Sequence, residues 1–254
     1  MPTTQRPPPI CLMLLATTML IATTKCEEEG EYPEELKEEC KGMVVNAGTD
    51  DKAAFHDGKC YFYDATSLTW KKANEECQKI PSNSNPSNFE PGQLVMPTMT
   101  KDEFHKILTD LTANRFIWIG VKKAGNDYVW AEKRGDTTKV PGWITEGIQV
   151  EGNGACVRYF HEGLRKALDC DGAKHPFVCQ HEIKKCSASD VPFGVELDGV
   201  APDAQVLPHT PAVMKCKAGH SMEGNAQGEQ NVVCKAGEWK LQGDTEPKDC
   251  AKGE

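Results

Sequence analysis

Two segments between residues 60 and 112 repeat apolar residues at the spacing of an amphipathic helix. The first helix is predicted over residues 67–79. The second begins near Thr100, which forms an S/T-x-x-E capping pattern with Glu103. The inward-facing positions of these helices are Trp70, Ala73, Cys77, Phe104, Ile107, Leu108 and Leu111. Because strand-like segments follow the two helices, the pattern indicates an α+β domain with two helices.

The remaining pattern is typical of strands and turns. Tyr61-Phe62-Tyr63 predicts a strand, and residues 81–93, rich in Ser, Asn and Pro, predict a surface loop between the helices. From Cys186 onward helix signals are scarce, Gly, Pro and Val are frequent, and Asp198-Gly199 indicates a turn. The cysteine spacing also changes after Cys179. We therefore expect a second, small all-β module at the C-terminal end.

The N-terminal segment bears on how the 12 cysteines are used. Residues 1–26 carry Arg6 and an apolar run over residues 10–22, which is the pattern of a signal peptide. No later stretch approaches the roughly 20 apolar residues that a membrane helix needs. The pattern predicts a secreted protein with paired cysteines. If cleavage leaves Cys26 in place, its odd thiol predicts a disulfide-linked dimer, whereas its removal leaves ten cysteines that can pair internally.

Charge is concentrated in one segment. Of the net −9, residues 27–39 contribute −7 through eight glutamates and one lysine. With little to bury, this segment is interpreted as a solvated or partly helical acidic extension. The acidic composition and the lack of a basic patch argue against nucleic acid as a partner.

The cysteines and tryptophans between Cys60 and Cys179, with Trp118-Ile119-Gly120-Val121 among them, resemble a C-type lectin-like domain. The resemblance implies its long form, over residues 40–182, with Cys40 closing an N-terminal hairpin. The implied disulfides are Cys40–Cys60, Cys77–Cys179 and Cys156–Cys170. The resemblance also implies a binding protein, because many members of the family bind a sugar through a bound calcium ion.

The calcium ligands of that family are replaced here. Ile144 to Gln149 follow Trp143 without the expected proline triplet, Gly154-Ala155 precede Cys156, and Arg165-Lys166-Ala167 stand where a Trp-Asn-Asp triplet is expected. Cationic side chains repel a metal, so we expect no calcium at the usual sugar site and no other cofactor, while calcium held by an irregular set of oxygens stays open. An irregular cluster of oxygen-bearing side chains remains as the candidate ligand-binding set, namely Glu146, Gln149, Glu151, Asn153 and Asp169.

A short motif, Arg134-Gly135-Asp136, resembles the tripeptide that integrins bind. Glycine in a polar turn is also what a hairpin requires, so a purely structural role stays open. Loss of cell attachment on Asp136→Glu would favour the adhesive role.

The second cysteine group, with Gly237, Trp239 and Pro247 before Cys250, is similar to a sushi, or complement control protein, module over residues 186–250. The resemblance implies the disulfides Cys186–Cys234 and Cys216–Cys250. About 65 residues bury too little surface to be stable unaided, so two disulfides around one tryptophan are the expected remedy.

No nucleophile elbow, P-loop, dinucleotide-binding glycines or zinc helix is present in the sequence. We therefore expect no enzyme but a secreted recognition protein that binds a glycan or an extracellular protein, in innate recognition or in cell and matrix contact. Two other interpretations are a structural matrix component and an integrin-binding adhesive protein.

Overall fold

The computed structural model describes residues 32–43, 51–79, 87–112, 115–131, 139–151, 154–160, 163–222 and 228–252. The expected signal peptide with Cys26, the Arg134-Gly135-Asp136 motif and Asn153 lie outside these residues. In the described part, no helix is long and apolar enough to cross a membrane.

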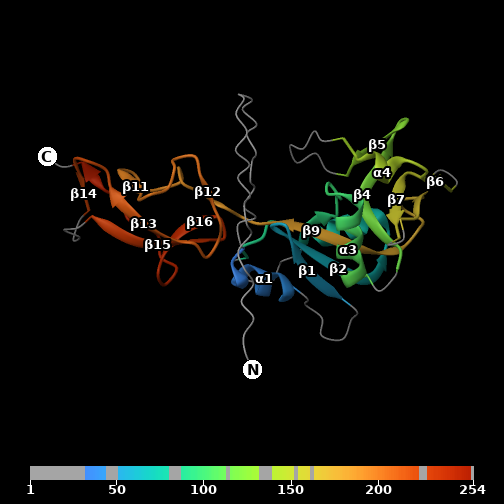
Figure 1. The fold of residues 1–254 in the computed structure, drawn as a ribbon, viewed down its shortest axis with the longest axis horizontal. Coiled ribbons are helices and arrows are strands. Elements are labelled where there is room, and N and C mark those ends of the chain that lie inside the picture. Colours follow the sequence, from blue (N-terminus) through green and yellow to red (C-terminus); the bar gives the residue numbers. More distant parts are fainter. Residues whose placement is uncertain are drawn as a thin grey trace, which may run out of the picture. The chain divides into compact units, whose positions relative to one another are not determined.

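Both helices and strands occur before residue 183, and strands alone follow it within the described ranges (Figure 1). The helices are α1 (Glu34–Lys41), α2 (Trp70–Lys79), α3 (Lys101–Leu111) and α4 (Gly142–Thr145). The strands up to residue 182 are β1 (Lys52–His56), β2 (Lys59–Leu68), β3 (Gln93–Leu94), β4 (Ile117–Ala124), β5 (Asp127–Trp130), β6 (Gln149–Val150), β7 (Cys156–Tyr159), β8 (Arg165–Leu168) and β9 (His175–Glu182).

These strands form one sheet in the order β1-β2-β9-β4-β7-β8-β6, with β3 paired to β9 and β5 to β4. Most pairs are antiparallel, but β4 and β9 run parallel, with Trp118 opposite Phe177, and so do β6 and β8. Because side chains alternate across a strand, Trp118 and Ile119 enter different hydrophobic clusters. The cluster of Ile119 includes the apolar stripe of α3, and that of Trp118 includes the buried residues of α1 and α2.

The helix over residues 101–111 follows its predicted pattern. Thr100 is the N-cap, its hydroxyl accepts a hydrogen bond from the Glu103 amide, and the Glu103 carboxylate accepts one from the Thr100 amide at 2.9 Å. Phe104, Ile107 and Leu108 are buried. The other predicted helix begins at Trp70 rather than residue 67, because β2 continues to Leu68.

The expectation of two helices in the lectin-like part was too low, since α1 and the short α4 add to them. Helix α1 lies partly within the acidic segment and runs across the expected boundary at residue 40. Leu36 and Cys40 are fully buried and pack in the same cluster as Trp70. A single leucine among glutamates gives little hydrophobic signal in the sequence. One buried residue in each turn, here Leu36 and Cys40, nevertheless attaches the short helix to the core.

Five disulfides join described residues: Cys40–Cys60, Cys77–Cys179, Cys156–Cys170, Cys186–Cys234 and Cys216–Cys250. These are the pairs that the two family resemblances imply. Such a density of disulfides is typical of extracellular proteins.

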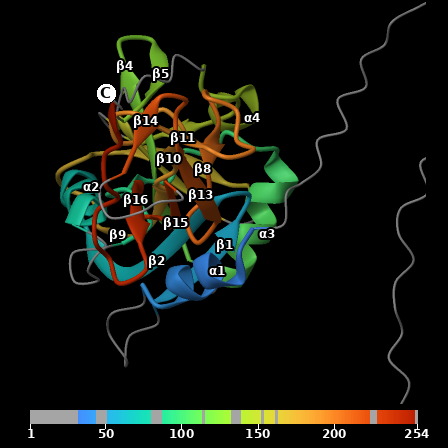
Figure 2. The ribbon, with the colours of Figure 1, turned by 90° about the vertical axis from the view of Figure 1, so that its left-hand side faces the viewer.

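The C-terminal strands are short and antiparallel. They are β10 (Cys186–Ser187), β11 (Val195–Leu197), β12 (Gln205–Val206), β13 (Pro211–Cys216), β14 (His220–Ser221), β15 (Glu229–Lys235), β16 (Glu238–Leu241) and β17 (Ala251–Lys252). The main sheet has the order β11-β13-β15-β16, seen in Figure 2. Trp239 is 3% exposed in a hydrophobic cluster with Met214 and Val232, and its indole N–H donates to the Ser187 carbonyl at 3.0 Å.

Candidate functional site

The long loop that follows β5 is anchored by apolar side chains of α4. Ile144 is fully buried. The Trp143 ring lies 6.0 Å from Phe104 of α3 and 6.1 Å from Tyr159 of β7, measured between ring centroids. Burial raises the pKa of the Tyr159 hydroxyl to about 12, so this side chain is neutral at physiological pH. The base of the loop is therefore a packed aromatic cluster.

Arg165, the first residue of β8, holds the loop from the other side. Its guanidinium donates one hydrogen bond to the backbone carbonyl of Trp143 and another to that of Glu146 at 2.7 Å. Charged donors make stronger hydrogen bonds than neutral ones. The arginine thus supplies positive charge to loop oxygens, a task that a bound cation performs in calcium-dependent sites.

Lys166, the next residue, makes the second contact to the loop. Its ammonium forms an ion pair with the Glu151 carboxylate at 2.6 Å. The hydrogen bond from Lys166 lowers the pKa of Glu151, whose carboxylate therefore stays ionised. The backbone adds to this contact, because β6 pairs with β8 and the Glu151 amide donates to the Ala167 carbonyl at 3.0 Å. The carboxylate is committed to a side chain of the protein.

The predicted ligand set is only partly brought together. Glu146, Gln149 and Glu151 lie along the loop beside β8, and all three are exposed. Asp169 lies beyond the end of β8, where its carboxylate accepts from the Asp171 amide at 3.2 Å. Asn153 lies outside the described residues.

These residues do not fit a calcium ion. Calcium needs about six to eight oxygen ligands, mostly carboxylates and carbonyls. Here Lys166 neutralises Glu151, and Arg165 occupies two of the loop carbonyls. Within the described ranges, no group of three or more His, Cys, Asp or Glu side chains is arranged to hold a metal. In the described part of the loop, positive side chains contact oxygen atoms that a metal would need as ligands.

Sequence reasoning overlooked a second group of side chains around Arg158 of β7. The guanidinium lies 4.2 Å from the centre of the Phe116 ring and donates to Nε2 of His175 at 3.0 Å. Phe160 packs on Phe116 with 4.8 Å between ring centroids. Burial, followed by the charge of Arg158, lowers the pKa of His175 to about 4, so this imidazole is neutral and free to accept. The sequence signal was only that Arg158 alternates with buried Val157 and Tyr159.

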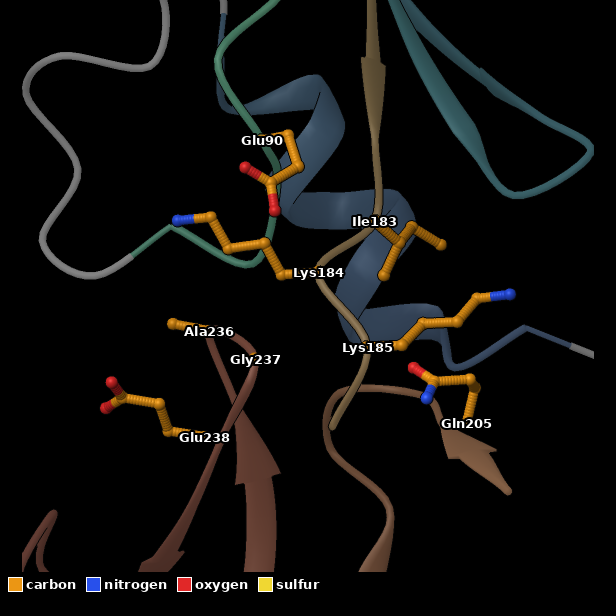
Figure 3. A pocket seen from close by; sticks show the side chains of 8 residues that line it. All are labelled: Glu90, Ile183, Lys184, Lys185, Gln205, Ala236, Gly237 and Glu238. Atoms are coloured by element: carbon orange, nitrogen blue, oxygen red, sulfur yellow. The ribbon is translucent and has the colours of Figure 1, made fainter. Parts of the chain in front are cut away.

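A polar cavity of about 500 Å³ lies at the segment between β9 and β10 (Figure 3). Its lining includes Glu90, Lys184, Lys185, Gln205 and Glu238. The two lysine side chains extend to opposite sides of the backbone, so the cavity does not direct both cations at one anion (Figure 3).

Asn88 connects the loop before β3 to the C-terminal strands. It is 1% exposed, its amide donates to the Glu39 carboxylate at 2.8 Å, and its side-chain oxygen accepts from the Ala236 backbone at 2.6 Å. His209 also contacts Glu39, at 2.9 Å. This polar contact joins three segments that are distant in the sequence.

The first part of the chain matches a known family model. Residues 66–181 match the family model of the Lectin C-type domain. Rheacalcin-2 of Rhea americana is 18% identical over 130 residues, which is 50% of this chain and 91% of that protein.

Solved structures give partial matches. The Ca²⁺-independent C-type lectin SPL-2 from Saxidomus purpuratus is 25% identical, with 50% of this chain and 89% of that chain covered and a TM-score of 0.38. The carbohydrate-recognition domain of cow CD23 is 20% identical, with 53% and 95% covered and a TM-score of 0.40. The match to the family model carries the assignment. Residues 66–181 of this protein form a C-type lectin-like domain.

Proposed function

We propose that this protein is a secreted recognition protein whose lectin-like domain binds a glycan or an extracellular protein without calcium. C-type lectin-like domains are generally binding proteins rather than enzymes. The proposed binding surface is the long loop with β6 and β8, where Glu146, Gln149 and Val150 are exposed. Val150 is 49% exposed, an apolar side chain available to a ligand.

The observation that carries this proposal is the use of Arg165 and Lys166 as internal cations. Arg165 donates hydrogen bonds to the Trp143 and Glu146 carbonyls of the loop, and Lys166 forms an ion pair with Glu151. A loop whose oxygen atoms are bound by the protein's own arginine and lysine side chains needs no metal to keep its shape. Its conformation is then present before the ligand arrives, which lowers the entropic cost of binding.

We infer that residues 186–250 form a sushi module. Support comes from the first-to-third and second-to-fourth disulfides, the short antiparallel strands and the buried Trp239. Modules of this kind act as spacers or protein-binding units, so the module extends the recognition role to protein partners.

The first test measures binding to an array of glycans, in calcium and in EDTA, together with the thermal midpoint. We expect the same binding and the same midpoint in both buffers. Arg165→Met should weaken binding and lower the free energy of unfolding by about 1–3 kcal/mol, because two charged hydrogen bonds to the loop are lost.

Lys174→Met is the matched control, because it removes an exposed lysine outside the loop. Its binding and stability should equal those of the wild type. Binding that disappears in EDTA, or a midpoint that rises with calcium, would contradict the proposal.

A further inference from the structure

We propose that Arg158 forms an anion-binding site for an acidic saccharide, meaning a sugar that carries a carboxylate or a sulfate. The site lies on the face of the sheet formed by β4, β7 and β8, where Arg158 is opposite Trp118 and Lys166. This inference rests on the proposed function and specifies the ligand class of the lectin-like domain.

The guanidinium of Arg158 is partly buried and incompletely satisfied. Among the described residues, its hydrogen-bond acceptor is the His175 ring, and its Nε atom is buried with no acceptor. No carboxylate in the described part of the chain forms an ion pair with it. Unsatisfied charged donors cost more free energy than neutral ones, so a partly exposed guanidinium with one described acceptor favours an added anion.

The neighbours of Arg158 strengthen this conclusion. Lys166 is directly opposite on β8, and like charges at directly opposed positions of a sheet destabilise it. Among the described residues, Glu151 is a carboxylate that interacts with the charge of Arg158, and its ion pair is with Lys166. Among the described residues, one negative charge therefore faces two positive charges, and an anion bound over this face of the sheet would balance them.

Aromatic rings border the same position. Phe116 lies under the guanidinium, and Phe160 packs against Phe116. Both side chains are partly exposed. Stacking on Phe116 fixes the plane of the guanidinium, and a fixed plane favours the paired contacts that carboxylates and sulfates make with arginine. The apolar face of a sugar ring packs well on such aromatic edges. A free inorganic anion would contact only the guanidinium and gain nothing from the rings.

The test compares binding of matched neutral and acidic oligosaccharides in EDTA, measured for the wild type, Arg158→Gln and Arg158→Lys. We expect the wild type to prefer the acidic saccharide, with an affinity that falls as salt rises. Arg158→Gln should lose at least about tenfold in affinity for the acidic saccharide. Arg158→Lys should retain part of it, because the charge remains but the planar fork does not.

The control variant is Lys106→Gln, which removes an exposed cation on α3 and should bind as the wild type does. Near-ultraviolet circular dichroism checks that each variant is folded, and Arg158→Lys keeps the test valid if Arg158→Gln unfolds. Inorganic sulfate at matched ionic strength is the competing probe, and sulfate that competes as well as the saccharide would overturn the sugar assignment.

Equal binding of neutral and acidic saccharides, or an unchanged affinity in Arg158→Gln, would overturn this inference and leave calcium-independent recognition standing. Calcium-dependent binding of the acidic saccharide that still requires Arg158 would instead contradict the proposed function alone.

Discussion

Replacing Cys77 and Cys179 by alanine should lower the free energy of unfolding by about 4–5 kcal/mol. The bond closes a segment with a sequence separation of 102 residues, and its loss frees the unfolded chain over almost the whole lectin-like domain. Both cysteines are fully buried in the cluster that contains Trp70 and Phe177, so the variant also loses packing. Equilibrium denaturation in urea measures the change.

The matched control is the double replacement of Cys156 and Cys170. Their sequence separation is 14, for which the same chain-entropy argument gives about 3 kcal/mol. The long-range pair should therefore cost about 1–2 kcal/mol more than the short-range pair. The reverse order would show that chain entropy does not govern the contribution of these disulfides.

Acid should destabilise the domain through His181. This imidazole is fully buried, and its Nδ1 atom donates to the Glu90 carbonyl at 3.1 Å. Burial lowers the pKa of His181 to about 4, against 6.5 in the unfolded chain. The unfolded state thus binds the proton more tightly, and the stability present above pH 6.5 is lost as the pH falls toward 4. The expected loss from this residue is about 3 kcal/mol.

His181→Gln should flatten this dependence, because glutamine keeps a donor for Glu90 and does not titrate. The free energy of unfolding is measured by urea denaturation at a series of pH values between 7 and 4. His220→Gln, at a partly exposed histidine in β14, is the control and should keep the wild-type slope. An unchanged slope in His181→Gln would place the acid sensitivity elsewhere. His175, whose pKa is also lowered to about 4, acts in the same direction, so His181→Gln should reduce the slope without removing it.

Local patterns in the sequence were sufficient for several elements. The capping pattern of Thr100 and Glu103 located the start of α3, because both partners lie within one helical turn. The triplet Arg165-Lys166-Ala167 predicted that the usual calcium site is absent, because it places cations where oxygens are needed. The disulfide pairs followed from resemblance to known families, since spacing alone leaves many pairings open.

Contacts between distant segments were decided by the tertiary structure. The sequence identified Arg165 as a cation but not that it binds the carbonyls of Trp143 and Glu146, 22 and 19 residues earlier. Arg158 meets Phe116 and His175 because β7 pairs with β4, and β4 runs beside β9. Composition and periodicity indicate on which face of a helix or strand a side chain lies. Only the pairing of strands determines which side chain lies opposite, and therefore which charges remain for a ligand.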